Sequence, residues 1–329
     1  MNYRILGKTN LSISEISLGT WQVGGKWGDP FDFSLANNIL SEAVEKGVNF
    51  IDTADVYGNE VGQSETAVGK FLKSRSEEIY VATKCGRQLS PHTNEAYQPA
   101  VLRKFVEDSL KRLSIDRIDL IQLHCPPTEV YYRPEIFGLF EKLKEEGKIR
   151  HLGVSVEKIE EGLKAIEFDN VCTIQIIFNM FRQRPTELFF EQVKKKNVGV
   201  LARVPLASGL LTGKFSKDST FGANDHRSFN RNGEMFDKGE TFSGIDYQTG
   251  LKAVEELKTI FAGQNLAQMA LRWILDFEAI SCVIPGASRP EHISMNLDAL
   301  NAPNLRPEQC IAVNRVYEKY IKESVHHLW

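Results

Sequence analysis

Eight short apolar runs recur along the chain, and each is rich in isoleucine, valine, leucine or phenylalanine, as buried strands are. They read EISLGT (15–20), VNFIDT (48–53), EIYVATK (78–84), IDLIQLH (118–124), IRHLGVS (149–155), CTIQIIFN (172–179), GVLARVP (199–205) and SCVIPG (281–286). Segments with helical periodicity separate most of them, as at 34–45, 99–113 and 134–146, and proline or glycine marks their ends. This alternation predicts parallel strands joined by right-handed crossovers, in an open doubly wound sheet or a closed barrel.

Polar or conformationally special residues stand at the end of nearly every run. These ends hold Thr20, Asp52, Lys84, His124, Ser155, Gln175 or Asn179, Arg203 and the pair Pro285-Gly286. An open sheet gathers its site at one switch point, whereas a barrel collects the carboxyl ends of all its strands around one mouth. The pattern therefore favours an α/β fold of the (β/α)8 TIM-barrel type, with residues 1–329 as a single barrel domain.

The regular spacing breaks once, after the seventh run. Residues 206–247 are rich in glycine, serine, asparagine and aspartate and show little periodicity. Long irregular loops are usually functional or disordered, and this one follows the seventh strand on the catalytic face of a barrel. We therefore expect a lid or a cofactor clamp rather than a passive excursion. Residues 305–329 are expected to add a C-terminal helix, up to residue 324, and a short tail.

Composition narrows the class of partner. The 329 residues are 42% hydrophobic and 25% charged, as in a globular protein. The 40 basic and 43 acidic residues give a net charge of -3 and form no basic tract, so we expect small-molecule partners rather than nucleic acid or membrane. Five scattered cysteines without a CxxC pair indicate a reducing compartment and no metal site. The N-terminus has no secretory signal, and a cytoplasmic location is expected.

Several nucleotide and hydrolase motifs are missing from the sequence. No GxGxxG follows the first run, which argues against a Rossmann cofactor site. The segment 209–214 is one residue short of a P-loop and lacks the serine or threonine after its lysine. Its glycines and Lys214 remain suited to holding a phosphate in another geometry. HExxH and GxSxG are also missing, so zinc peptidase and α/β-hydrolase chemistry have no support.

Four polar residues at or near the ends of the second, third and fourth runs are the strongest candidates for catalysis: Asp52, Tyr57, Lys84 and His124. A tyrosine has a pKa near 10, and a neighbouring ammonium group helps it to exchange its proton at neutral pH. A carboxylate such as Asp52 holds Lys84 as a cation, and His124 adds a donor for a carbonyl oxygen. The alternative for each residue alone is an ordinary buried salt bridge or a packed side chain.

The segments DTADVYG (52–58), ATK (82–84), IDLIQLH (118–124), GKIRHLGVS (147–155) and PLASGLLTGK (205–214) resemble the aldo-keto reductase family. The resemblance runs from residue 6 to about residue 296. It implies a (β/α)8 barrel that binds NADPH, or less often NADH, without a Rossmann fold, and that reduces carbonyls or oxidises alcohols. Tyr57 is then the general acid, Lys84 and Asp52 tune it, and His124 orients the carbonyl, with no metal required.

The resemblance also implies a set of cofactor positions. Thr20 and Trp21 match the end of the first strand, where the family contacts cofactor and substrate, and Ser155 and Gln175 match positions that bind the nicotinamide carboxamide. The other implied cofactor-binding residues are Asp52, Arg203, Pro205, Leu206, Ser208, Gly209, Leu211, Gly213, Lys214, Gly286, Ser288, Arg289, His292 and Asn296.

This sequence departs from the family at three places. Val156 replaces the asparagine common after Ser155, which removes one carboxamide partner. Arg203 stands where many relatives stack a tyrosine or tryptophan on the nicotinamide, and its charge disfavours the oxidised ring unless an acidic neighbour compensates. In the segment that matches the adenosine site, His292 stands where relatives often have glutamine or arginine, and Met295 where they often have an acidic residue. Arg289 beside Ser288 still suits a 2′-phosphate, so NADPH is favoured over NADH.

Two other functions remain open. One is a regulatory or channel-associated subunit that binds cofactor with little turnover. The other is a barrel enzyme acting on phosphorylated sugars, although its phosphate segments match the cofactor instead. The substrate depends on loops 23–33, 126–133 and 215–247, and the sequence sets neither substrate nor oligomeric state.

Overall fold

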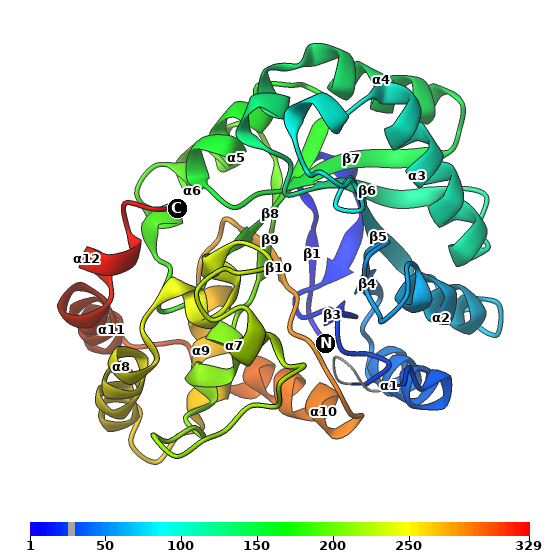
Figure 1. Cartoon of the computed structure of the whole chain (residues 1–329). Coiled ribbons are helices and arrows are strands. Elements are labelled where there is room, and N and C mark those ends of the chain that lie inside the picture. The colour runs from blue at the N-terminus through cyan, green and yellow to red at the C-terminus, as the bar shows by residue number, and fades with distance from the viewer. Residues whose placement is uncertain (26–29) are drawn as a thin grey trace.

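The computed structural model describes residues 1–25 and 30–329. Eight parallel strands form one sheet in the order β10-β9-β8-β7-β6-β5-β4-β3, with a ring of helices outside it (Figure 1). The strands are β3 (Leu18–Gly19), β4 (Phe50–Asp52), β5 (Tyr80–Cys85), β6 (Ile118–His124), β7 (Ile149–Ser155), β8 (Val171–Ile177), β9 (Gly199–Arg203) and β10 (Ile280–Val283). This arrangement confirms the (β/α)8 barrel.

The barrel closes between β3 and β10. Isolated parallel bridges join Ile16 to Val283 and Gly19 to Gly286. Backbone hydrogen bonds reinforce them, including one of 3.0 Å from the Gly19 N–H group to the Pro285 carbonyl. The other junctions of the barrel are ladders of consecutive paired residues, whereas this closure consists of isolated bridges.

An antiparallel hairpin precedes the barrel, and the apolar pattern did not predict it. It consists of β1 (Tyr3–Ile5) and β2 (Ser12–Ser14), with the 3-10 turn η1 (Gly7–Thr9) between them. Its buried side chains, among them Leu6 and Ile13, pack with Phe50, Leu120 and Leu201 from the barrel strands. The hairpin therefore fills the end of the barrel opposite the strands' carboxyl ends.

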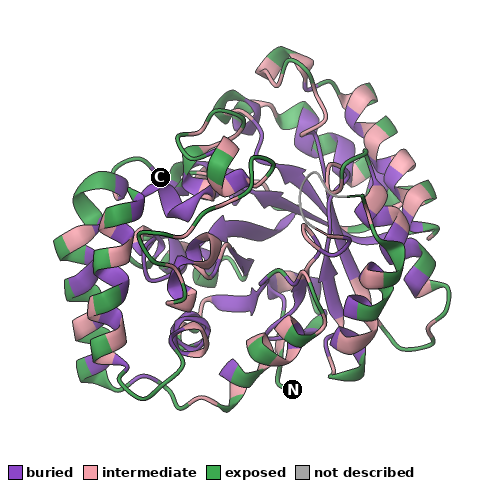
Figure 2. Cartoon of the chain, turned by 60° about the horizontal axis from the view of Figure 1, so that its bottom comes forward, coloured by how far each residue is buried: buried purple, intermediate pink, exposed green. Residues whose placement is uncertain are grey.

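The helices cover the outside of the barrel, and their inner faces are buried while their outer faces meet solvent (Figure 2). Most follow a strand. They are α1 (Phe33–Glu45), α2 (Gln63–Leu72), α3 (Pro99–Leu113), α4 (Pro134–Glu145), α5 (Ile159–Ala165), α6 (Phe189–Lys195), α8 (Tyr247–Ile260), α9 (Leu266–Leu275), α10 (Glu291–Leu297), α11 (Pro307–Tyr320) and α12 (Lys322–Val325). The expected helices at 34–45, 99–113 and 134–146 are present within one residue of their bounds, and the expected final helix is divided into α11 and α12. Among the described residues no helix is both long and apolar enough to span a membrane.

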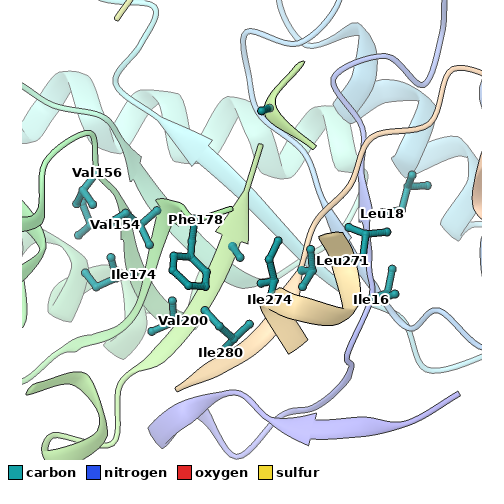
Figure 3. Close-up of a cluster of buried hydrophobic side chains, with 14 of the residues drawn as sticks. Ile16, Leu18, Val154, Val156, Ile174, Phe178, Val200, Leu271, Ile274 and Ile280 are labelled. Carbon is teal, nitrogen blue, oxygen red and sulfur yellow. The ribbon is translucent and has the colours of Figure 1, made fainter. Parts of the chain in front are cut away.

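The larger hydrophobic cluster lies between the strands and this outer layer (Figure 3). Ile174, Val200 and Ile280 come from neighbouring strands and belong to the same buried cluster as Leu271 and Ile274 of α9. Because strand side chains alternate between two faces, the residues between these positions point into the barrel. A strand buried on both sides in this way reads as a nearly continuous apolar run, which explains the eight runs in the sequence.

Inside the barrel the inward positions change from apolar to polar along β4, β5, β6 and β9. Phe50 is followed by Asp52 on β4, Ala82 by Lys84 on β5, and Leu201 by Arg203 on β9. On β6 the series runs from Leu120 through Gln122 to His124. Since the strands are parallel, all polar ends reach the same mouth of the barrel.

Residues 206–247 lie over that mouth, and they are not wholly irregular as the sequence suggested. They contain the 3-10 turns η5 (Ala207–Thr212), η6 (Lys238–Glu240) and η7 (Phe242–Gly244) and the single-turn helix α7 (His226–Phe229). Short turns of this kind produce no periodicity over a window long enough to detect. We call residues 206–247 the mouth loop.

Trp329 anchors the mouth loop from below. Its indole Nε1 donates to Asp237 Oδ1 at 2.8 Å, and the Arg182 guanidinium lies 4.1 Å from the ring. A Cβ atom on Gly244 would lie 2.5 Å from Trp329 Cη2, so the ring packs directly on the loop backbone. The tail 325–329 is therefore packed into the fold.

Candidate active site

Lys84 joins the two other groups at the centre of the mouth. Its Nζ atom donates to Asp52 Oδ2 at 2.5 Å, to Tyr57 Oη at 3.1 Å and to the Thr53 carbonyl at 2.9 Å. Asp52 is the last residue of β4 and Lys84 the last but one of the neighbouring strand β5. Tyr57 lies on the turn after β4, where its N–H group donates to the Ala54 carbonyl at 3.2 Å. The sequence hypothesis that these three residues meet therefore agrees with their geometry.

Two buried amides complete the surroundings of Asp52. Gln175 Nε2 donates to Asp52 Oδ1 at 2.8 Å, and Gln122 Nε2 donates to the same atom at 3.1 Å. With Lys84 on Oδ2, both carboxylate oxygens are engaged, and this fixes the orientation of the whole group. The sequence singled out Gln175 for the cofactor, but it did not reveal this contact or the role of Gln122.

The charges in this cluster act in opposite directions on Tyr57. Burial raises the pKa of Tyr57 above its ordinary value of 10, while the Lys84 ammonium lowers it. Burial also opposes the charge on Lys84, but Asp52 and Tyr57 outweigh burial, and the pKa of Lys84 is raised. Lys84 thus stays a cation, and Tyr57 stays a phenol that can give up its proton to a stronger base.

His124 lies on the other side of the Tyr57 ring. The two ring centroids are 6.1 Å apart in an edge-on arrangement. Burial, together with the charges of Lys84, Arg87 and Arg203, holds the pKa of His124 well below its usual value. The imidazole is therefore neutral at physiological pH and can donate a hydrogen bond without carrying a charge.

A cavity of about 270 Å³ opens above these residues, and we call it the inner cavity. It is lined by Trp21, Val56, Tyr57, Arg87, His124, Ser155, Gln175, Arg203, Phe236 and Glu240. Two further cavities, of about 290 and 500 Å³, continue from it along the mouth loop towards Gly286, Ser288 and His292. Neighbouring cavities share lining residues, so together they make a long groove with one end at Tyr57.

Most of the cofactor positions expected from the sequence line this groove. They are Trp21, Asp52, Ser155, Gln175, Arg203, Pro205, Leu206, Ser208, Gly209, Gly286, Ser288 and His292. The backbone of Val204, Ala207, Ser208 and Gly209 has positive φ, and such turns direct N–H groups into anion-binding concavities. An extended ligand with phosphate groups fits a groove with this lining.

The remaining expected positions lie beside the groove. Leu211 is fully buried in the core, and Gly213 ends η5 with a left-handed backbone. The Thr20 hydroxyl lies 2.7 Å from Ser64 Oγ, so its hydrogen bond is made inside the fold. Asn296 Nδ2 donates to the Gly286 carbonyl at 3.4 Å and steadies that backbone.

His292 organises the far end of the groove. Arg289 Nε donates to His292 Nε2 at 3.0 Å, and Ser288 Oγ lies 3.5 Å from His292 Nδ1. Burial and the positive charges of Arg289 and Lys214 lower the pKa of His292. The neutral ring holds Arg289 by its Nε, which leaves the two terminal nitrogens of the guanidinium for a ligand.

Arg203 has the acidic neighbours that its charge requires. Its Nη2 atom donates to Glu157 Oε2 at 2.9 Å and to the Val156 carbonyl at 3.2 Å, and its Nη1 atom lies 3.5 Å from Glu240 Oε1. The acidic neighbour that the sequence analysis left open is therefore present, and the charge of Arg203 is compensated. Cys125, Glu157 and Glu240 form a cluster of metal-ligand type, but Arg203 already neutralises it, and we assign it no metal.

The mouth loop also contributes aromatic rings that sequence reasoning missed. The His226 ring is tilted against the Trp21 ring with 4.7 Å between their centroids, and the Phe236 ring lies edge-on to Trp21 with 6.3 Å between their centroids. Their positions within a loop gave no signal. For Glu157 and Arg87 the sequence held a weak signal of membership in the site, because each follows the end of a strand by two residues. The loop expected at 23–33 includes residues 26–29, which lie outside the described residues.

Comparison with known proteins agrees with this geometry. The family model described as "Aldo/keto reductase family" matches residues 15–318. The chain is 32% identical to "Uncharacterized oxidoreductase YqkF" of Bacillus subtilis over 95% of both chains, and 30% identical to "NADH-specific methylglyoxal reductase" of Escherichia coli over 90% of this chain and 92% of the relative. The solved structure "aldo-keto reductase AKR11C1 from Bacillus halodurans (holo form)" is 28% identical, covers 96% of both chains and has a TM-score of 0.78.

Proposed function

Because this chain belongs to the aldo/keto reductase family, and is thus an NAD(P)H-dependent oxidoreductase, we propose that it transfers a hydride between NADP(H) and a small carbonyl or alcohol substrate. The substrate class is aldehydes, ketones or sugar-like carbonyls. One observation carries the proposal: Lys84 Nζ bridges Asp52 and Tyr57 at the base of the inner cavity, with neutral His124 beside them.

Tyr57 acts as the general acid in this proposal. A bound nicotinamide cofactor supplies the hydride to the carbonyl carbon, or accepts it from an alcohol. As negative charge develops on the carbonyl oxygen, Tyr57 Oη gives its proton to that oxygen, and Lys84 stabilises the phenolate that remains. Asp52 keeps Lys84 charged and in place. Neutral His124 donates a hydrogen bond to the same oxygen and orients the carbonyl.

In this proposal the groove would hold the cofactor. Ser155 and Gln175 serve the carboxamide of the nicotinamide, and the turn at 204–209 takes the phosphates. At the far end the pair Ser288 and Arg289, with Lys214 nearby, favours the 2′-phosphate of NADPH, because guanidinium binds phosphate through two parallel hydrogen bonds. The NADH specificity named for the Escherichia coli relative makes NADH the alternative.

The experiment that tests the proposal follows NADPH oxidation with a panel of short aldehydes, with Tyr57→Phe as the matched variant. We expect turnover to fall at least about 100-fold in the variant, which is the usual contribution of a positioned general acid, while NADPH affinity is kept. Near wild-type turnover in Tyr57→Phe would remove Tyr57 from the mechanism. Cofactor binding without any turnover of the wild type would favour a regulatory subunit.

A further inference from the structure

Arg87 enters the inner cavity by a turn that only glycine allows. Strand β5 ends at Cys85, and Gly86 follows with a φ of +106°. A Cβ atom at Gly86 would lie 2.8 Å from Tyr97 Oη, so no larger residue fits there without displacing Tyr97. The turn directs the next residue, Arg87, into the cavity that Tyr57 and His124 also line.

Arg87 has no fixed partner within the described part of the chain. No hydrogen bond or ion pair engages its guanidinium, although the side chain is partly buried. Arg203, the other arginine of the inner cavity, contrasts with it, because Glu157 and Glu240 hold Arg203. Withdrawing a guanidinium from water without a partner is unfavourable, so its position favours a ligand that brings negative charge.

Burial opposes the charge on Arg87, whereas Cys125, Glu240 and Glu157 favour it and raise its pKa, but none of these groups forms an ion pair with its guanidinium in the described part of the chain. Lys84 and Asp52 neutralise each other, and His124 is neutral. Glu157 and Glu240 are both near the single guanidinium of Arg203, and the pKa of Glu240 is raised to about 8 by burial and by Glu157, so the pair keeps one proton at neutral pH. The charges of the paired groups then sum to zero. The positive charge of Arg87 is the one that no ion pair in the inner cavity neutralises.

His92, which is near Arg87, does not add to the charge. Burial and the positive charge of Arg87 lower the pKa of His92 to about 4, and its Nε2 atom lies 2.9 Å from Tyr97 Oη. The positive charge available to a ligand is therefore that of Arg87. A guanidinium presents a planar fork of donors, which matches two oxygens of a carboxylate or a phosphate.

We propose that the substrate carries an anionic group, a carboxylate or a phosphate, in addition to its carbonyl, and that Arg87 binds that group while Tyr57 and His124 face the carbonyl. This inference rests on the proposed function and names its substrate class. The volume of the inner cavity, about 270 Å³, and the apolar side chains of Val56 and Phe236 limit the substrate to a short compound with its two polar ends close together.

Matched pairs of aldehydes test the proposal, because each pair differs by the anionic group. The carboxylate pair is 4-oxobutanoate and butanal, and the phosphate pair is glyceraldehyde 3-phosphate and glyceraldehyde. We expect kcat/KM of the wild type to be at least about tenfold higher for the anionic member of at least one pair, as one charge-assisted contact supplies. The pair with the larger ratio identifies the anion.

Variants assign that preference to Arg87. Arg87→Met should reduce the anionic-to-neutral ratio at least about tenfold, and Arg87→Lys should restore part of it, since lysine keeps the charge without the fork. Arg117→Met is the matched control, because Arg117 is exposed just before β6, at the opposite end of the barrel from His124. The control removes the same charge and should leave the ratio as in the wild type.

Binding measurements test the inference independently of turnover. Succinate and inorganic phosphate are titrated calorimetrically into the wild type and into Arg87→Met, each saturated with NADP⁺. Weaker binding of at least one anion to the variant supports the proposal, and equal binding of both overturns it. If the wild type reduces butanal and glyceraldehyde but shows a ratio near one that Arg87→Met does not change, the inference fails while the proposed function stands. Failure to oxidise NADPH with all four aldehydes contradicts the proposed function instead, and the two titrations still decide whether Arg87 binds an anion.

Discussion

Glu240 in the mouth loop pairs with Arg203 at the end of β9, with Glu240 Oε1 3.5 Å from Arg203 Nη1. Glu157 approaches the same guanidinium to 2.9 Å, so two carboxylates compete for one cation. Burial and Glu157 raise the pKa of Glu240 to about 8, against the effect of Arg203. Burial raises and Arg203 lowers the pKa of Glu157, and the balance leaves it at about 2. The contact that holds the mouth loop over the barrel thus contains one proton at neutral pH.

This proton makes stability depend on pH. Between the ordinary glutamate pKa of 4.5 and about 8 the folded protein keeps the proton on Glu240, whereas the unfolded chain has released it. The free energy of unfolding should therefore fall as pH rises through this window, by up to about 1.4 kcal/mol for each pH unit. Glu240→Gln cannot release a proton, so the variant should lose this slope.

Denaturant unfolding at pH 5.5 and 7.5 measures the effect as the difference between wild type and Glu240→Gln, in which contributions from other groups cancel. Glu129→Gln, at an exposed position, is the control and should keep the wild-type slope. Equal slopes for wild type and Glu240→Gln would show that the carboxylate pair holds no proton in this range.

Lys84 should control the pH profile of alcohol oxidation, where Tyr57 must act as a base. The Lys84 ammonium lowers the pKa of Tyr57, so Lys84→Met should raise that pKa and move the acidic limb of kcat/KM, along which activity rises with pH, to higher pH. Because Asp52 would lose its buried partner, the double variant Asp52→Asn with Lys84→Met guards against misfolding. A profile that stays at the wild-type position in both variants would reject the tuning role.

Arg289 should discriminate between the two nicotinamide cofactors. Its terminal guanidinium nitrogens remain available while His292 holds its Nε. Arg289→Ala should therefore weaken NADPH binding by about 1.5–3 kcal/mol and NADH binding much less, since NADH lacks the 2′-phosphate. Fluorescence titration with both cofactors measures this, and exposed Arg315→Ala is the control. Equal losses for both cofactors would place the phosphate elsewhere in the groove.

Trp329 should affect the cofactor from outside the groove. Trp329→Ala removes the hydrogen bond to Asp237 and the surface on which Gly239 and Gly244 pack, so the mouth loop should open more often. We expect the KM for NADPH to rise about threefold or more and limited proteolysis to cut within 206–247 faster. Leu328→Ala, at an exposed neighbour, should change neither. If Trp329→Ala were cleaved within 206–247 at the same rate as the wild type, other contacts would hold the loop.

The sequence alone was sufficient to predict which side chains lie at the centre of the candidate site. Asp52, Lys84 and His124 each end an apolar run, and parallel strands necessarily bring such ends to one mouth. Tyr57 follows within one short turn of β4, so its place is nearly fixed as well. These positions depend on local periodicity and on one rule of topology.

Other parts of the site depend on contacts that no local pattern records. Glu240 meets Glu157 only because the mouth loop folds back over β9, and Trp329 meets Asp237 only through the packing of α11 and α12. The hairpin of β1 and β2 was missed because three-residue strands are too short to show alternation. The sequence therefore could not show whether an acidic residue compensates the charge of Arg203.

The isolated bridges that close the barrel between β3 and β10 affect how the fold responds to a ligand. Segments from distant parts of the chain meet there, and such contacts form late because a long loop must close first. The groove straddles this junction, since Gly19 and Gln22 line one side of it and Ile284 and Gly286 the other. A dinucleotide bound across both sides would hold them together, and its binding free energy would add to the free energy that keeps the barrel closed. Binding in the groove and closure of the barrel would thus be coupled. We therefore expect the unliganded protein to open first between β3 and β10.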